Sequence, residues 1–272
     1  MSQIFQYSYL YFILICFIVF LYFITQYAFK NGYPTCDNYV VNVYLYLGMS
    51  ICLIGLFAYI LNMLLWSNTK DRITPMTISD IYQRLGMYYF GSVIVGFIFI
   101  IILSYRNLYS LNGHFLNHIL WICFLLCISI MLYPLFKDQK SYMYVDKAFL
   151  SASIIFICMS LVVYMYPSFF EKTYNFMMIG LFIGLIAVII IELVSIFFLS
   201  QNKNAAAENN YGWRKYITYF IIVLFALFVS YDTITVFREA KSCVNYPNYP
   251  KSSLNFFLDI LNLFSSLMSS YR

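Results

Sequence analysis

The chain has 272 residues, of which 63% are hydrophobic, 22% are aromatic and only 10% are charged. This composition excludes an ordinary soluble domain, in which about a quarter of the residues are charged, and indicates an integral membrane protein. The net charge of +5 is therefore informative through its distribution among the loops, and no nucleic-acid partner is expected.

Eight apolar segments follow one another along the chain, and each is long enough to cross a bilayer core, which takes about 20 residues. They are Tyr9–Phe29, Val43–Trp66, Gly86–Ser104, Leu116–Phe136, Phe149–Tyr166, Thr173–Leu199, Ile217–Phe237 and Ser253–Tyr271. The first has no basic residues before it and is too long for the apolar part of a secretory signal, so we predict a true membrane helix. The fold class predicted is all-α, a polytopic transmembrane bundle of seven to eight helices.

Basic residues are unevenly distributed among the connections between these segments. Three alternate connections carry three Lys or Arg each: Ser67–Leu85, Lys137–Ala148 and Ser200–Tyr216. The connections between them carry one each: Lys30, Arg106 and Lys172. The positive-inside rule then places the N-terminus and the basic connections in the cytosol. The last connection breaks the pattern, because Arg238, Lys241 and Lys251 would face the other side.

Two of the seven cysteines lie in loops, whereas the other five lie within apolar segments, where a thiol packs as a small hydrophobic group. The two are Cys36 and Cys243, and a topology of eight spans places both on the non-cytosolic side. A disulfide between them is compatible with that side. Two unpaired thiols are the alternative.

The sequence contains no signature of a soluble enzyme, such as a Gly-rich phosphate loop, Gly-x-Ser-x-Gly or His-Glu-x-x-His. We therefore expect no enzymatic activity, no cofactor and no structural metal. The sixth segment carries Gly180 and Gly184 in a Gly-x-x-x-Gly pattern, which allows close helix packing within the bundle or between protomers. Glu192 lies further along this segment, where it would line one end of a pathway or pair with a nearby Lys or Arg.

The last two segments each contain one aspartate in an otherwise apolar run, Asp232 and Asp259. A carboxylate in a membrane helix is unfavourable by about 2.5–3.5 kcal/mol, so it normally marks a functional site. If the polar connection is Arg238–Ser252, each aspartate lies about six residues, or ~9 Å, from the same membrane face. Two consecutive antiparallel helices would then bring the two carboxylates into contact.

The last segment also carries a polar stripe at helical spacing, formed by Asn255, Asp259, Asn262 and Ser266. In a membrane such a stripe should face protein or a water-filled cavity rather than lipid. The alternative is an amphipathic helix that lies flat in the interface with Asp259 in water.

Two carboxylates in a site of low polarity cannot both ionise cheaply, so the pair is expected to titrate as a unit. With one shared proton the two helices are held together. With both groups ionised, repulsion separates the helices or a cation binds between the oxygens, for which Ca²⁺ is suited. A calcium ion bound transiently by Asp232 and Asp259 is therefore expected.

Residues Tyr231-Asp232-Thr233, followed in the next segment by Leu258-Asp259-Ile260-Leu261-Asn262-Leu263-Phe264, resemble the C-terminal signature of the transmembrane Bax-inhibitor-motif family. The resemblance implies a helical bundle that leaks calcium from intracellular stores and restrains cell death. It implies that Asp232 and Asp259 form a proton-sensitive latch on the pore. It also implies a basic residue near the end of the family's second helix that engages the aspartates, and counting backwards from Asp232 indicates Arg106.

Two features depart from the family pattern. Ile234 stands where the family often has glutamine, and the chain has one apolar segment more than the family's seven helices. The additional helix is most simply placed in residues 1–30, which leaves residues 31–272 as the Bax-inhibitor-like bundle.

The alternative function is that of a structural membrane protein that transports nothing. An inner-membrane scaffold of a large DNA virus would be one example, and the chain would then be a viral member of the family. The expected location is an endomembrane (endoplasmic reticulum or Golgi) or the inner membrane of a virion. Expected partners are the lipid bilayer, cations with calcium as the permeant ion, further copies of the chain and other membrane proteins.

Overall fold

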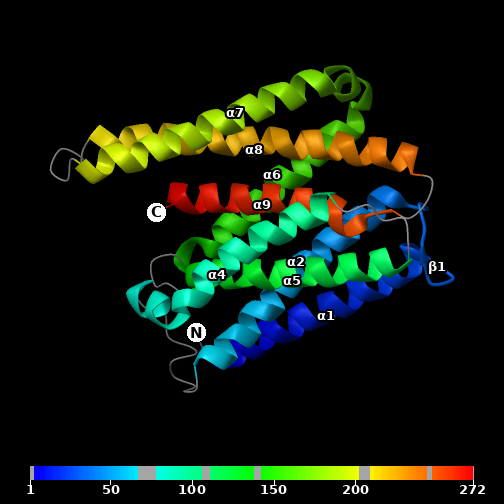
Figure 1. Cartoon of the computed structure of the whole chain (residues 1–272), viewed down its shortest axis with the longest axis horizontal. Helices are drawn as coiled ribbons and strands as arrows, with labels where there is room; N and C mark the ends of the chain where they lie inside the picture. The colour runs from blue at the N-terminus through cyan, green and yellow to red at the C-terminus, as the bar shows by residue number, and fades with distance from the viewer. Residues whose placement is uncertain are drawn as a thin grey trace. The chain divides into compact units, whose positions relative to one another are not determined.

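The computed structural model describes residues 3–66, 78–105, 111–137, 142–201, 209–243 and 247–271, and helices make up nearly all of them (Figure 1). The helices are α1 (Gln3–Tyr27), α2 (Tyr39–Leu65), α4 (Ile78–Tyr105), α5 (Leu111–Lys137), α6 (Tyr142–Met165), α7 (Pro167–Gln201), α8 (Asn209–Ser242) and α9 (Tyr249–Tyr271). Two short antiparallel strands, β1 (Phe29–Lys30) and β2 (Tyr33–Pro34), form a hairpin between α1 and α2. Each apolar segment of the sequence corresponds to one helix, and where a segment was predicted to end later than its helix, the difference is one or two residues. This agreement confirms the all-α membrane bundle.

Seven of the described helices are long and apolar enough to cross a membrane. Their spans are Leu10–Tyr27, Tyr39–Leu65, Ser79–Tyr105, His114–Lys137, Tyr144–Met165, Pro167–Ile191 and Lys215–Ser242. The helix outside this set is α9, whose polar residues lower its hydropathy although most of its side chains are buried. The bundle is therefore polytopic, with seven candidate spans among the described residues.

The connection between α8 and α9 is shorter than the sequence suggested. Helix α8 does not end near Arg238 but continues to Ser242, and α9 begins at Tyr249 rather than Ser253, so only residues 243–248 connect them. Arg238 therefore lies inside α8 and not in the connection. Its guanidinium carbon lies 3.6 Å from the centre of the Tyr174 ring. Pro250, in the first turn of α9, needs no backbone donor there.

The chain divides into two compact units. Unit 1 consists of Met1–Met143 and Glu239–Phe257, and unit 2 consists of Tyr144–Arg238 and Leu258–Arg272. In unit 1, α1 approaches α2 closely at Gly48, where a Cβ atom would lie 2.4 Å from the ring of Phe20. Glycine at this position therefore allows the first helix to dock.

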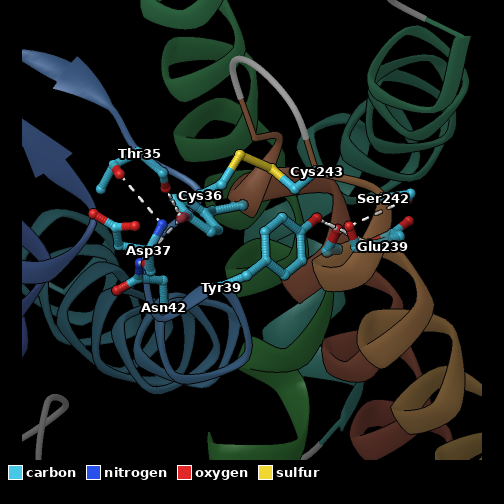
Figure 2. The surroundings of a disulfide bond; sticks show 10 residues. Thr35, Cys36, Asp37, Tyr39, Asn42, Glu239, Ser242 and Cys243 are labelled. Carbon is cyan, nitrogen blue, oxygen red and sulfur yellow. Dashed lines mark hydrogen bonds between the residues drawn. A yellow bond between two sulfur atoms is a disulfide. The ribbon is translucent and has the colours of Figure 1, made fainter.

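A disulfide in unit 1 joins Cys36, which follows β2, to Cys243, which follows α8. Their Cα atoms are 5.9 Å apart although 207 residues separate them in the sequence. Figure 2 shows Tyr39 beside the disulfide with its hydroxyl directed toward Glu239. That hydroxyl donates to Glu239 Oε2 at 3.0 Å, and the hydroxyl of Ser252 donates to the same oxygen at 2.6 Å. Covalent and polar contacts thus fasten the beginnings of α2 and α9 to the end of α8.

A second polar cluster in unit 1 surrounds Asn42, whose side chain is fully buried. Its amide nitrogen lies within hydrogen-bonding distance of the carbonyls of Tyr27 and Asp37 and of the Tyr249 hydroxyl. Tyr249 in turn donates to the carbonyl of Thr35. Burial raises the pKa of Tyr249 to about 12, so this hydroxyl remains a neutral donor. The amide nitrogen of Asn42 and the hydroxyl of Tyr249 are thus paired within the protein, whereas Oδ1 of Asn42 is buried and makes no hydrogen bond with any described residue.

In unit 2 the Gly-x-x-x-Gly pattern places only one of its glycines against a neighbouring helix. A Cβ atom on Gly184 of α7 would lie 2.7 Å from Cδ1 of Leu224 in α8, whereas a Cβ atom on Gly180 would have no neighbour within 4 Å. Leu181, Val188 and Leu224 form a buried apolar cluster around this contact. The close helix approach thus lies within the bundle, at Gly184.

Replacing Gly184 with alanine is expected to destabilise the protein relative to Gly180→Ala, because the new methyl group would overlap Cδ1 of Leu224 and this buried side chain would have to move. The matched change Gly180→Ala adds a methyl group where there is room and also improves helix propensity. Thermal unfolding of the detergent-solubilised protein should show a lower Tm for Gly184→Ala alone. Equal Tm values for the two variants would contradict this packing.

Replacing Cys36 with serine is expected to lower the Tm, because the bond closes a long loop and such a cross-link contributes about 2–4 kcal/mol. The control is Cys158→Ser, which removes an exposed free thiol. On a non-reducing gel only the Cys36→Ser variant should migrate like the reduced protein. Unchanged migration and Tm would show that the two cysteines are not bonded in the membrane.

Candidate functional site

Three consecutive residues of α8, Tyr231, Asp232 and Thr233, contact three different helices in unit 2. Successive residues of an α-helix point about 100° apart, so a run of three can reach three neighbours. The Tyr231 ring stacks on Tyr174 of α7, with ring centres 4.8 Å apart, and its hydroxyl donates to that of Tyr174 at 3.0 Å. The Thr233 hydroxyl lies 3.4 Å from Ser160 Oγ of α6. Asp232, between them, meets α9.

The partner of Asp232 in α9 is Asp259, and a side-chain hydrogen bond joins the two. Asp232 is 9% exposed and Asp259 is 5% exposed. An ionised carboxylate can only accept hydrogen bonds, so a direct bond between two carboxyl groups requires a proton on one of them. This arrangement therefore describes a pair with one shared proton.

Two buried polar atoms near this contact have no hydrogen-bond partner among the described residues. Oδ2 of Asp259 is buried and makes no hydrogen bond with any described residue, and the same holds for the hydroxyl of Ser230 in α8. A buried carboxylate oxygen without a donor is unfavourable, whereas a neutral acid is much less so.

The other residues predicted for the pathway are not gathered around this pair. Asn255 of α9 is exposed and belongs to unit 1, whereas Asn262 is half-buried, about one turn beyond Asp259. Glu192 lies in α7, but its side chain is not among those described. Arg106 lies outside the described residues, so its proposed contact with the aspartates stays a prediction. The site is therefore the pair and the residues that flank Asp232.

Two contacts of this site escaped the sequence analysis. Tyr174 and Ser160 are ordinary residues of apolar segments, and nothing in their neighbourhood marks them. A signal did exist on α8, where Tyr231, Thr235 and Arg238 fall at i, i+4 and i+7 and so share one face. A stripe of this kind on the helix that carries Asp232 predicts a polar partner on the helix next to it.

Comparison with known proteins identifies one family. The family described as Bax1-I, inhibitor of apoptosis-promoting Bax1, matches residues 36–271. The match begins after α1, covers α2 to α9, and includes both aspartates and the residues around them. No curated protein matches the chain. Because the family match covers most of its length, the chain belongs to the Bax1-I family of integral membrane proteins.

Proposed function

We propose that this chain is a pH-sensitive cation leak channel, with calcium as the permeant ion, and that Asp232 and Asp259 form its latch. The proposal rests on the direct contact between two carboxyl groups that are more than nine-tenths buried. A pair of this kind is unfavourable in a protein that only has to fold, since apolar side chains of similar size would fill the space more cheaply. Its presence in an apolar bundle is therefore best explained by function.

The shared proton supplies the pH dependence. While one proton remains, the hydrogen bond holds α8 and α9 together at this point. When the pH rises and that proton leaves, two negative charges face each other with little water to screen them. Repulsion then favours separation of the helices. The latch is thus closed at lower pH and opens as the pH rises.

Calcium fits the open form of the latch, because it prefers carboxylate oxygens. Among the described residues no group of three or more His, Cys, Asp or Glu gathers to hold a metal ion. Two carboxylates alone provide fewer oxygens than the six to eight ligands that calcium takes. The ion would therefore meet the pair in passing, with water completing its shell, as suits a permeant ion.

The orientation proposed is a cytosolic N-terminus, with the disulfide in an oxidising lumen. The α1–α2 connection follows one candidate span and the α8–α9 connection follows seven, so both lie on the same side. Cys36 and Cys243 meet there, and disulfides persist in oxidising compartments such as the endoplasmic reticulum. Residues 243–248 themselves carry no Lys or Arg, which reduces the conflict with the positive-inside rule. The location proposed is therefore an endomembrane, with the inner membrane of a virion as the alternative.

A structural scaffold remains the second candidate, and the fastened turns of unit 1 suit it. The disulfide and the contacts of Glu239 stabilise the fold without moving any ion. A scaffold would be abundant in its membrane or particle, whereas a leak channel would be scarce. It would also tolerate neutral substitutions at both aspartates.

Replacing Asp232 with asparagine should keep the latch closed at every pH, because the amide donates a hydrogen bond to Asp259 without a titrating proton. Calcium flux in proteoliposomes should rise with pH for the natural chain, by up to about tenfold per pH unit below the midpoint, and stay low for the variant. Asp232→Ala removes the hydrogen-bond partner of Asp259, so calcium flux should be present at every pH between 6 and 8. Asp146→Asn, an exposed aspartate of α6, is the control. If calcium flux through the natural chain does not change with pH, the latch hypothesis is wrong.

The proposed orientation predicts that the N-terminus is accessible from the cytosolic side of the membrane and that Cys36 and Cys243 are accessible only from the other side. In intact microsomes a protease added outside should digest a tag on the N-terminus. Cys36 and Cys243 should react with a maleimide that cannot cross membranes only after reduction and permeabilisation. Labelling of both after reduction alone would place them in the cytosol and reverse the orientation.

A further inference from the structure

One face of α8 carries a column of contacts that begins next to Asp232 and leads away from it along α7. We propose that Arg238 and Tyr174 are positioning residues that hold α8 in the closed state of the latch and so set the pH at which flux begins. This inference rests on the proposed function. It assigns a role to two residues that do not touch the aspartates.

Tyr174 of α7 is held on several sides. The guanidinium carbon of Arg238 lies 3.6 Å from the centre of its ring, and Nη2 of the same arginine donates to the carbonyl of Glu171 at 3.2 Å. Tyr231 stacks on the ring with an angle of 18° between the planes. The Tyr174 hydroxyl accepts from the hydroxyls of Tyr231 and Thr235, at 3.0 and 3.3 Å. A cation over a tyrosine face is attractive, and a guanidinium is well suited to it.

The column is coupled to the latch through the backbone of α8. Tyr231 and Asp232 are adjacent residues of one continuous helix, so a rotation of α8 that withdraws Asp232 from Asp259 must also swing Tyr231 away from Tyr174. Arg238, about two turns further along α8, would leave the Tyr174 ring in the same movement. Opening therefore breaks the column, and the column adds to the stability of the closed state.

The ionisable groups around the pair separate into two sets. In the proposed latch the pair releases the proton, and Tyr231 lies beside Asp232 in α8. Among the residues that the structure describes, the other groups on this face are Tyr174 and Glu171 of α7 and Arg238 of α8, and the contact from α6 is Ser160, which does not titrate. Between pH 6 and 8 phenols ordinarily stay neutral, whereas guanidinium groups and glutamate carboxylates ordinarily stay charged. The column therefore biases the latch equally at each pH.

A bias of this kind moves the midpoint of opening without changing its steepness. Removing the column destabilises the closed form, so opening occurs at a higher proton concentration, which means a lower pH. Loss of a single partly exposed cation–π contact changes the ratio of closed to open protein by about threefold. For the release of one proton this equals a shift of about half a pH unit.

The experiment measures calcium flux through the full chain in proteoliposomes from pH 5.5 to 8.5. Tyr174→Leu removes the whole column and Arg238→Gln removes only the cation, so the first should shift the midpoint further than the second. Tyr174→Phe keeps the ring beneath Arg238 but loses the hydroxyl, and it should fall between the natural chain and Tyr174→Leu. The matched control is Tyr88→Leu, an exposed tyrosine of α4, which should leave the midpoint in place.

A second readout follows the pair directly and does not need flux. The infrared band of the protonated carboxyl, assigned by its loss in Asp259→Asn, should disappear at a lower pH in Tyr174→Leu than in the natural chain. If Tyr174→Leu does not fold, Tyr174→Phe and Arg238→Lys serve in its place. Lysine keeps the charge but not the planar stack, so a smaller shift than for Arg238→Gln supports the inference.

The two hypotheses fail in different ways. If Asp232→Asn abolishes the pH dependence while all Tyr174 and Arg238 variants keep the natural midpoint, the positioning role is overturned and the latch stands. If Asp232→Asn leaves the pH profile unchanged, the latch itself is overturned and the positioning role with it. A change of steepness in the Tyr174 variants would also overturn the inference, because it would mean that the column takes part in proton release.

Discussion

The contact between Asp232 and Asp259 is the constraint on which the rest of the site depends, because two buried carboxylates that were both ionised would repel each other. While the two groups are in contact, they fix which faces of α8 and α9 meet at this point of unit 2. The residues on both sides of Asp232 reinforce this constraint. Tyr231 is committed to α7 and Thr233 to α6, so the orientation of α8 is set by three neighbours at once. The Tyr-Asp-Thr sequence thus connects α8 to three neighbouring helices.

Much of this arrangement follows from the sequence. Apolar runs of sufficient length predicted each helix, and the rarity of charge in such runs drew attention to both aspartates. Their equal depth predicted the contact, although the connection used for the estimate was too long. The error came from Arg238, which looks like a loop residue. Its stack on Tyr174 depends on a residue 64 positions away in the sequence (238 − 174), and no local pattern could predict it.

The spacing of the two glycines of α7 also could not predict which of them contacts a neighbouring helix. Gly180 and Gly184 occupy equivalent places in the pattern, but only Gly184 faces Leu224. Which glycine makes the helix contact depends on the rotation of α7 against α8, a property of the folded unit. The same limit applies to α9, where the polar stripe correctly marked Asp259 as buried but treated Asn255 as its equivalent. Asn255 is exposed, because burial changes along a helix as its neighbours change.

The bond between Cys36 and Cys243 has a consequence for how the protein is made. It closes a covalent ring that contains six of the described helices, α2 and α4 to α8. Cys36 leaves the ribosome 207 residues before its partner, so its thiol must wait while those helices are inserted one after another. Oxidation can therefore close the ring only after α8 has been synthesised and Cys243 has reached the compartment that holds Cys36.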